Sequence, residues 1–425
     1  MALDPWQTVF QCSMLSNTAG MKYYTQPKSN PSALQDAETA MLADINAAIA
    51  AGIPSGWTVA WGPAVYCVGS IPWKDKDGTL YFTPTNAVVI FSTTDSAGAT
   101  TYVVALAATN GLSVVDWLKE DFNVGTMVDW ATAMKGWGAN YTATTAAHIS
   151  TATNTGITNV LTQLQSGGQN IIQFLNSVTT TNNTLIFTGH SLAGALSPTL
   201  TAACFDAVAP LVTNKNFAVG STMVYPTAGA TPGDGAFSQQ FAALGLGGED
   251  GSEYWQKWNK DLWNVLDVVP HAWQTVVKVG ELVIHQPQSP YVQEIEATYT
   301  ASNAYTSTAD KVAITALIGT AALNSINGSI SGKSWYTALP NAPLTNAFYY
   351  GYPGDGGVTN VVTQAQAQAL GYTGTGTLVP WDMQFLYQHV QAYGQMILGN
   401  APPIVVQPKK LKTAEEPAAA DLALV

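Results

Sequence analysis

The chain has 425 residues, enough for one large α/β unit with insertions or for two or three domains. Charged residues make up only 10% of it and hydrophobic residues 47%, so its polarity comes mainly from hydroxyl and amide side chains, as in extracellular or polymer-facing proteins. Because the net charge is −12 and the sequence contains no arginine, we do not expect it to bind nucleic acid or anionic membranes through charge.

The first part of the chain predicts one helix and a group of strands. Apolar residues recur at helical spacing over Ser32–Ala51, and Gly52 follows as a stop signal. Strand-like runs come next, and the turn Asp95–Gly98 between the last two predicts a hairpin. The predicted strands are Thr58–Gly69, Thr79–Phe82, Ala87–Thr93 and Thr101–Ala108.

Helices and strands alternate in the following part of the chain. A long helix is predicted near Ala147–Val178, followed by a short buried strand at Leu185–Phe187 and a helix over Leu192–Phe205. An antiparallel start followed by such alternation predicts a mostly parallel sheet covered by helices on both faces.

A serine lies at the sharp turn between that strand and that helix. The segment around Ser191 reads Gly-x-Ser-x-Ala, with Gly189 two residues before the serine and Ala193 two residues after it. At a strained turn of this kind the flanking residues must be small so that helix and strand can approach, and the serine hydroxyl projects. Gly194 further opens the turn. Ser191 is therefore the candidate nucleophile.

Several sequence blocks, in order along the chain, carry a family resemblance: Tyr102–Asn110, Val115–Asp121, Thr188–Leu196, Met223–Phe237 and Asn264–Pro270. They are similar to the successive signature blocks of the class 3 lipases, the fungal triacylglycerol lipase family. The resemblance implies an α/β-hydrolase fold acting on acylglycerols or other lipid esters. Two departures stand out: Ala107-Ala108 replaces the family's Arg-Gly before Thr109, and Ile149-Ser150 replaces its Gly-Phe after His148.

An α/β-hydrolase serine needs an acid and then a histidine later in the chain. Asp267 follows a short apolar run at a strand-to-loop edge and matches the family's acid. Of the later histidines, His271 follows Asp267 too closely to meet it across a site, and His285 is a weaker rival. His389 stands in a His-x-x-x-Tyr block that resembles the family's, so the predicted triad is Ser191, Asp267 and His389.

The oxyanion of an acyl-transfer reaction needs two preorganised N–H donors. One is expected to be the backbone N–H of Leu192, at the start of the helix after the serine. The resemblance implies that the other is the backbone N–H of Thr109, with its hydroxyl as a further donor. His190 is adjacent to the serine, and we expect its side chain to point elsewhere.

The stretch Leu112–Phe122 is amphipathic, with charged residues on the face opposite its apolar one. The resemblance implies a lid that covers the serine in water and moves away at an oil interface. The alternative is a fixed surface helix that packs the same face on the core. The apolar face consists of Val114, Val115, Trp117, Leu118 and Phe122.

We expect residues 1–401 to form one α/β-hydrolase domain. The interval between Asp267 and His389 exceeds what one crossover needs, so residues 272–379 are interpreted as an inserted cap. Residues 402–425, rich in Pro, Ala, Lys and Glu, are expected to be a disordered tail. Cys12 and Cys67 are the one cysteine pair considered for a disulfide, and Cys204 is expected in the core.

Taken together, these features predict a serine carboxylic-ester hydrolase that forms an acyl-enzyme. Its expected binding partner is a lipid ester substrate, met at an interface. Alternatives are an esterase for aromatic or polymeric esters, suggested by the 13 tryptophans, and an inactive binding protein on this fold. No cofactor or metal site is predicted, because the histidines and cysteines lack ligand spacing. No apolar run is long enough for a membrane span, and secretion is expected although the first eleven residues do not resemble a signal peptide.

Overall fold

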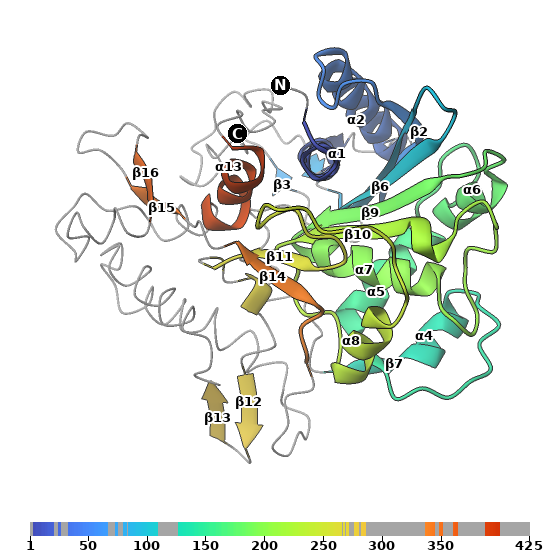
Figure 1. Ribbon diagram of the computed structural model, residues 1–425, viewed down its shortest axis with the longest axis vertical. Coiled ribbons are helices and arrows are strands. Elements are labelled where there is room, and N and C mark those ends of the chain that lie inside the picture. The colour runs from blue at the N-terminus through green and yellow to red at the C-terminus, as the bar shows by residue number, and fades with distance from the viewer. Residues whose placement is uncertain are drawn as a thin grey trace.

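The structure is a computed structural model of the chain (Figure 1). It describes residues 3–20, 24–26, 33–66, 73–74, 80–82, 84–108, 126–265, 267, 269–271, 276–279, 282–285, 336–344, 348–351, 360–363 and 387–399. Its main feature is a seven-stranded sheet with the order β14-β11-β10-β9-β6-β5-β2. In chain order these strands are β2 (Thr58–Tyr66), β5 (Asn86–Thr94), β6 (Thr100–Ala108), β9 (Thr184–His190), β10 (Thr222–Thr227), β11 (Asp261–Asn264) and β14 (Asn341–Leu344).

The sheet begins antiparallel and continues parallel, as predicted. β5 pairs antiparallel with both β2 and β6, whereas β6, β9, β10, β11 and β14 follow one another in parallel pairs. The predicted hairpin joins β5 to β6. Its turn is held by Asp95, whose Oδ1 accepts the backbone N–H groups of Ala97 and Ala99 at 2.9 Å each. Gly98 adopts the positive φ of 86° that this turn requires.

Helices cover both faces of the sheet (Figure 1). One face carries α1 (Pro5–Gly20), α2 (Ala33–Ala50) and α13 (Ala392–Leu398). The other carries α4 (Trp130–Gly136), α5 (Thr151–Thr162), α6 (Ile171–Ser177), α7 (Leu192–Cys204) and α8 (Gly235–Ala242). Each face therefore has its own hydrophobic core, because side chains alternate between the two faces along every strand.

Short elements complete the described part of the chain. A three-stranded sheet has the order β1-β4-β3, and three antiparallel pairs are formed by β7 with β8, β12 with β13, and β15 with β16. The strands are β1 (Tyr24–Gln26), β3 (Trp73–Lys74), β4 (Leu80–Phe82), β7 (Met127–Asp129), β8 (His148–Ser150), β12 (Val276–Val279), β13 (Leu282–His285), β15 (Phe348–Gly351) and β16 (Asn360–Thr363). Single helical turns lie at Val219–Ser221, Val269–His271 and Tyr387–Gln391.

Helix α1 packs on the sheet although the sequence pattern did not predict it. Its buried residues include polar ones such as Gln11, Ser13 and Ser16 as well as Phe10 and Leu15. Because nearly all sides of this helix are covered by protein, it lacks the one-sided apolar pattern by which surface helices are recognised. The buried hydroxyl of Ser16 has a hydrogen-bond partner, since it donates to the carbonyl of Ala105 on β6 at 3.1 Å.

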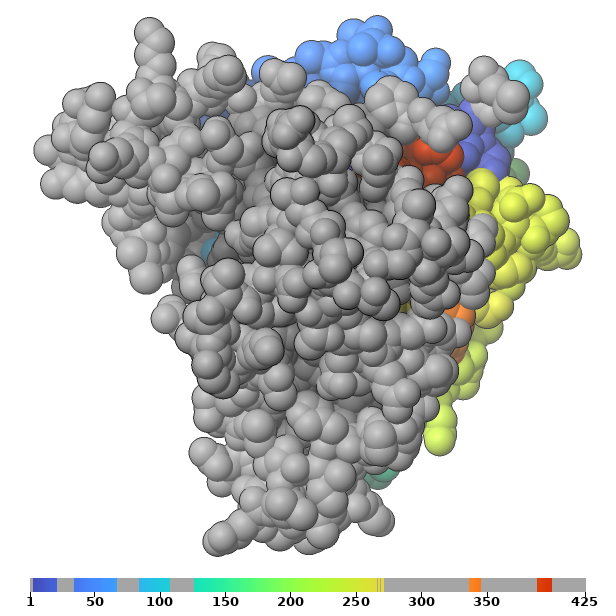
Figure 2. Space-filling view, turned by 90° about the vertical axis from the view of Figure 1, so that its left-hand side faces the viewer, coloured from blue at the N-terminus to red at the C-terminus, as the bar shows by residue number. Residues whose placement is uncertain are grey.

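The two ends of the described chain meet on this face. Gln7 of α1 donates through Nε2 to the carbonyl of Ile397 in α13 at 2.8 Å. The hydroxyl of Tyr254 donates to the neighbouring carbonyl of Met396 at 3.1 Å. In the side view, α13 (red) borders α1 (dark blue) and the segment that contains Tyr254 (yellow) (Figure 2). These contacts hold α13 on the sheet.

The prediction of one long helix near Ala147–Val178 is wrong. Residues 148–150 form β8, and two separate helices, α5 and α6, follow it. The chain turns between them at Gly167 and Gly168, which have positive φ values of 58° and 76°. Ser150 caps α5 by accepting the N–H of Thr153, and a capping box between Asn170 and Gln173 starts α6.

The structure also bears on the expectations for Cys12 and Cys204. Cys12 is a free thiol buried in α1, so it does not form the disulfide considered with Cys67, which lies outside the described residues. Cys204 is buried in α7, as expected.

Strand β14 falls within the range interpreted as a cap, yet it pairs with β11, so residues 341–344 belong to the central sheet. No described helix combines the length and hydropathy needed to cross a membrane.

Candidate active site

Ser191 occupies the turn between β9 and α7 in a strained backbone conformation, with φ of 62° and ψ of −126°. Two hydrogen bonds hold this turn. The N–H of Ser191 donates to the carbonyl of Thr227 on β10 at 3.0 Å, and the N–H of Gly194 donates to the carbonyl of Ser191 at 2.8 Å. Ser191 precedes α7 without a side-chain capping bond, so its Oγ is available to another partner.

The small residues around the serine are required by close backbone approaches. A Cβ at Gly189 would lie 2.4 Å from the carbonyl oxygen of Ala193. A Cβ at Gly194 would lie 2.5 Å from the carbonyl oxygen of Thr227 and 2.8 Å from the Cα of Gly229. Both collisions are with backbone atoms, which cannot move aside independently. The two glycines therefore let α7 start directly against β9 and the loop after β10.

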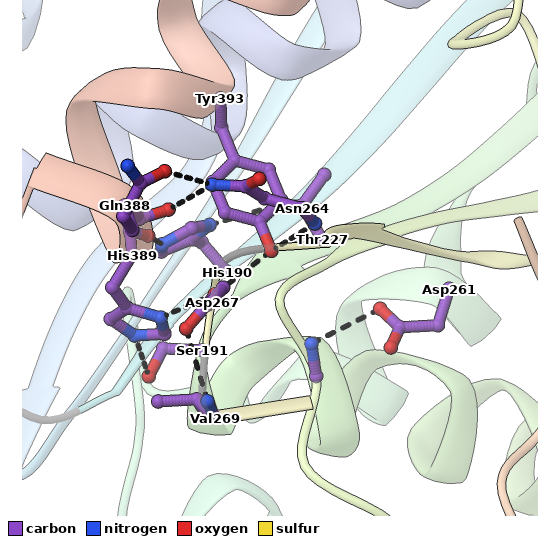
Figure 3. Close-up of polar contacts among 11 residues, drawn as sticks. His190, Ser191, Thr227, Asp261, Asn264, Asp267, Val269, Gln388, His389 and Tyr393 are labelled. Atoms are coloured by element: carbon purple, nitrogen blue, oxygen red, sulfur yellow. Dashed lines mark hydrogen bonds and ion pairs between the residues drawn. The ribbon is translucent and has the colours of Figure 1, made fainter. Parts of the chain in front are cut away.

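The structure brings the three predicted residues together (Figure 3). Nε2 of His389 lies 2.8 Å from Oγ of Ser191, and Nδ1 of His389 lies 2.8 Å from Oδ2 of Asp267. The second carboxylate oxygen, Oδ1, accepts the N–H of Val269 at 3.0 Å. All three side chains are buried, with exposed fractions of 4% for Ser191, 1% for His389 and 0% for Asp267. An imidazole held in this way can accept the serine proton at Nε2 while the carboxylate keeps a proton at Nδ1.

Parallel strand order explains why these residues meet. Ser191 follows β9 and Asp267 lies just beyond β11, and the carboxyl ends of parallel strands lie at one edge of a sheet. His389 comes from the π-helical turn Tyr387–Gln391, directly before α13. Wide turns of this type recur at functional sites because they displace one residue from the regular helical path.

A buried polar network supports the acid and the histidine. Tyr393, one turn after His389, donates its hydroxyl to Oδ2 of Asp267 at 2.8 Å and accepts the N–H of Asn264 at 2.8 Å. Asn264 donates through Nδ2 to both the carbonyl and Oε1 of Gln388, at 2.8 and 2.7 Å. The network joins the end of β11 to the turn that carries His389. Asn264 begins one of the blocks that carry the family resemblance, but the sequence pattern predicted no role for it or for Gln388. Tyr393 was visible in the His-x-x-x-Tyr block.

Of the predicted oxyanion donors, only Leu192 is described. It is the first residue of α7, and the first N–H groups of a helix have no acceptor within that helix. Such groups can stabilise an oxyanion formed next to Ser191. Thr109 lies outside the described residues, as do the lid residues Val114, Val115, Trp117, Leu118 and Phe122.

Ala107, which the sequence comparison above aligns with an arginine of the family that the chain resembles, is buried close to α1. A Cβ at Gly20 of α1 would lie 3.0 Å from Cβ of Ala87 and 3.4 Å from Cβ of Ala107. The small side chains of β5 and β6 thus allow α1 to pack against the sheet at this point.

Three other aspartates that follow Ser191 in the chain have partners outside the cluster of Ser191, His389 and Asp267. Asp206 accepts the indole N–H of Trp130 at 2.9 Å, and Asp234 lies 2.9 Å from Nδ1 of His148. Asp261 accepts the N–H of Gly229 at 3.1 Å and lies apart from the Ser191 cluster (Figure 3). Burial raises the pKa of the Asp261 carboxyl well above its ordinary value.

The other histidines take different positions. His285 ends β13, in the separate hairpin with β12, and His271 lies in the turn after Asp267; the side chains of both lie outside the description. His190 points away from Ser191, as expected, but its ring contacts the backbone of His389. The sequence pattern did not predict that contact. Among the described residues, no three His, Cys, Asp or Glu side chains are grouped so that they could hold a metal ion.

No family model matches the chain, and no curated protein matches it. Solved structures do match. The crystal structure of M37 lipase superimposes with a TM-score of 0.57 and 20% sequence identity, over 92% of this chain and 92% of that one. The chain has the fold of this lipase. The predicted α/β-hydrolase architecture is therefore confirmed, and the lipase resemblance seen in the sequence agrees with it at the level of the fold.

Two further solved structures match less well. A mutant form of MDLA from Penicillium cyclopium is matched with a TM-score of 0.39 and 14% identity, over 93% of this chain and 97% of that one. Lipase II from Rhizopus niveus is matched with a TM-score of 0.36 and 12% identity, over 63% of this chain and 74% of that one.

Proposed function

We propose that the protein is a serine carboxylic-ester hydrolase with Ser191, His389 and Asp267 as its catalytic triad. The observation that carries the proposal is the continuous hydrogen-bond chain from Oγ of Ser191 through His389 to Asp267, at 2.8 Å for each step. The strained backbone of Ser191 supports it, because such a turn is the geometry that presents a nucleophilic serine in α/β-hydrolases.

The reaction follows from these positions. Oγ of Ser191 attacks the carbonyl carbon of the ester while Nε2 of His389 takes the hydroxyl proton. The oxyanion is stabilised by the N–H of Leu192 and, as the sequence resemblance implies, by Thr109. Collapse of the intermediate expels the alcohol, which receives the proton from His389, and leaves an acyl-enzyme. Water, deprotonated by His389, then releases the acid and restores Ser191.

A fluorophosphonate probe tests the proposal, because it reacts with an activated serine and not with an ordinary one. Wild type should be labelled with one probe per chain, and Ser191→Ala should not be labelled. Ser197 provides a matched control, since it is a buried serine of α7 outside the triad, and Ser197→Ala should be labelled like wild type. A folded wild-type protein that resists the probe would favour the alternative of an inactive binding protein on this fold.

The substrate class that we propose is a lipid ester, such as an acylglycerol. It is supported by the sequence blocks that resemble class 3 lipases and by the shared fold with a protein described as a lipase. Hydrolysis rates over p-nitrophenyl esters of rising chain length, beside an emulsified triglyceride, test it. Rates that rise with acyl length support the lipid class. Preference for aromatic acyl groups would instead favour the esterase alternative.

The lid is also part of this proposal and rests on sequence alone, since Leu112–Phe122 lies outside the described residues. If the segment opens at an interface, the rate on a short-chain triglyceride should rise abruptly above its solubility limit. Trp117→Ala, on the apolar face, should weaken that rise. Because the protein is acidic and has no arginine, adsorption by apolar burial should survive high salt. Smooth saturation through the solubility limit would contradict the lid.

We also propose that the protein works outside the cell, as its low content of charged residues suggests. Esterase activity measured separately in the culture medium and in washed cells tests this location. Activity confined to the cells would contradict it.

A further inference from the structure

His190 is the last residue of β9, the strand that leads to the nucleophile, and its ring is buried between β10 and the turn that carries His389. Its Nε2 lies 2.6 Å from the carbonyl oxygen of His389, and its Nδ1 lies 2.9 Å from Oγ1 of Thr227. The ring is 1% exposed, and its centroid lies 5.0 Å from that of His389 and 5.1 Å from that of Tyr393. Figure 3 shows the ring bridging β10 and the backbone of the turn.

The partners of the ring define its protonation state. A carbonyl oxygen can only accept, so Nε2 of His190 carries the proton. The hydroxyl of Thr227 can donate to Nδ1, which leaves the ring neutral with both nitrogens paired. Burial, followed by the neighbouring ring of His389, holds the pKa of His190 well below its ordinary value. A neutral ring here avoids repulsion when His389 becomes an imidazolium during the reaction.

The hydrogen bond between His190 and the carbonyl of His389 bears on how His389 is kept next to Ser191. Ser191 and His389 are 198 positions apart in the sequence, and their side chains must stay within hydrogen-bond distance. Asp267 and Tyr393 orient the imidazole and the helix after it, but neither touches the strand of the nucleophile through the hydrogen bonds described above. His190 is adjacent to Ser191 on β9, so its bond ties the main chain of the base directly to the strand that presents Oγ.

Thr227 contacts both Ser191 and His190. Its carbonyl accepts the N–H of Ser191 at 3.0 Å while its hydroxyl holds His190 at 2.9 Å. One residue of β10 thus fixes both the backbone of the nucleophile and the ring that contacts the base.

We infer that His190 is a positioning residue of the active site, which sets the place of His389 relative to Ser191 by donating to the main-chain carbonyl of His389. The inference rests on the proposed function. A misplacement of about 1 Å between reacting groups can cost about a hundredfold in rate, so loss of this bond should lower kcat.

Two substitutions at His190 test the inference. Leucine removes both ring nitrogens, whereas the glutamine amide can donate to the carbonyl of His389 and accept from Thr227. With a soluble p-nitrophenyl ester, His190→Leu should lower kcat about 10- to 100-fold and leave KM within about twofold. His190→Gln should recover kcat to within about tenfold of wild type.

The rate of fluorophosphonate labelling should fall in parallel with kcat, whereas a purely structural role would lower thermal stability without changing kcat per folded active site. Wild-type kcat per folded active site in His190→Leu, at native or at lowered thermal stability, would overturn the inference. If His190→Leu does not fold, Thr227→Val decides: it removes the hydroxyl partner of Nδ1, and kcat should fall severalfold and return in Thr227→Ser. Wild-type kcat in Thr227→Val would then overturn it.

The wild-type control separates the two proposals. If wild type is not labelled at Ser191, the proposed function fails. If wild type is labelled and hydrolyses the ester but His190→Leu or Thr227→Val matches it, only the positioning role fails.

Discussion

The hydroxyl of Tyr393 donates to Oδ2 of Asp267 at 2.8 Å, to the same oxygen that faces His389. The acid of the proposed triad is therefore held by two side chains from one segment, since His389 and Tyr393 are one turn apart. Burial and the nearby charge of Asp267 raise the pKa of the Tyr393 hydroxyl well above its ordinary value, so it stays a donor.

Replacing Tyr393 by phenylalanine should affect both stability and rate. It removes a donor from Asp267 and leaves the buried N–H of Asn264 without its hydroxyl acceptor, a loss worth about 1–3 kcal/mol of unfolding free energy. We expect kcat to fall about three- to tenfold because Asp267 loses one of the bonds that orient it. Chemical denaturation and ester kinetics measure the two effects.

Tyr225→Phe is the matched control, since this buried hydroxyl donates to the carbonyl of Trp255 at 2.9 Å, away from the triad. It should lose stability with kcat unchanged. Equal kcat values for Tyr393→Phe and wild type would show that Tyr393 has no part in orienting the acid.

Substitutions in the triad should reduce turnover far more. Ser191→Ala and His389→Ala should each lower kcat by about four to six orders of magnitude, and Asp267→Asn somewhat less. Because the three residues act as a unit, the double mutants should be scarcely slower than Ser191→Ala. His285→Ala should keep wild-type activity. If His285→Ala is inactive while His389→Ala is active, the histidine has been misassigned.

Gly189→Ala should disrupt the turn that presents the serine. The new methyl group would lie 2.4 Å from the carbonyl oxygen of Ala193, so the start of α7 must shift. We expect a loss of about 3 kcal/mol in unfolding free energy and a large loss of probe labelling at Ser191. Gly220→Ala is the control, because a Cβ there would meet no atom of any other part of the described chain within 4 Å, and both properties should be retained. Full labelling of Gly189→Ala would contradict the requirement.

The buried His190 should make the protein less stable in acid. Its pKa is held well below the ordinary value of 6.5, so below that pH the unfolded chain binds a proton that the folded protein does not. The unfolding free energy should therefore fall as the pH drops from about 6.5 toward the lowered pKa, and it should not depend on this group above about pH 7. Denaturant titrations between about pH 4 and 8 measure the slope. His190→Gln should flatten it, and identical slopes for the two proteins would contradict a neutral His190.

Local sequence determined the features that depend on neighbouring residues. The place of Ser191 followed from a strand, small flanking residues and a helix, and the close approaches at Gly189 and Gly194 show why those residues are needed. The hairpin at Asp95 followed from turn chemistry that acts over a few residues. The antiparallel start and the parallel remainder of the sheet followed from the order of strands and helices.

Only the tertiary structure decided the features that depend on contacts between distant segments. His389 and Asp267 are 122 positions apart, and no local pattern states that they will meet. The bonds of His190, Asn264 and Gln388 link three different segments, so their side chains carry no periodic signal. Helix α1 escaped prediction because it is buried on most sides, and β14 became recognisable as a strand of the sheet only through its pairing with β11. Short-range sequence patterns reflect the local conformational preferences of neighbouring residues. Buried hydrogen bonds depend instead on which distant segments the packed core brings together.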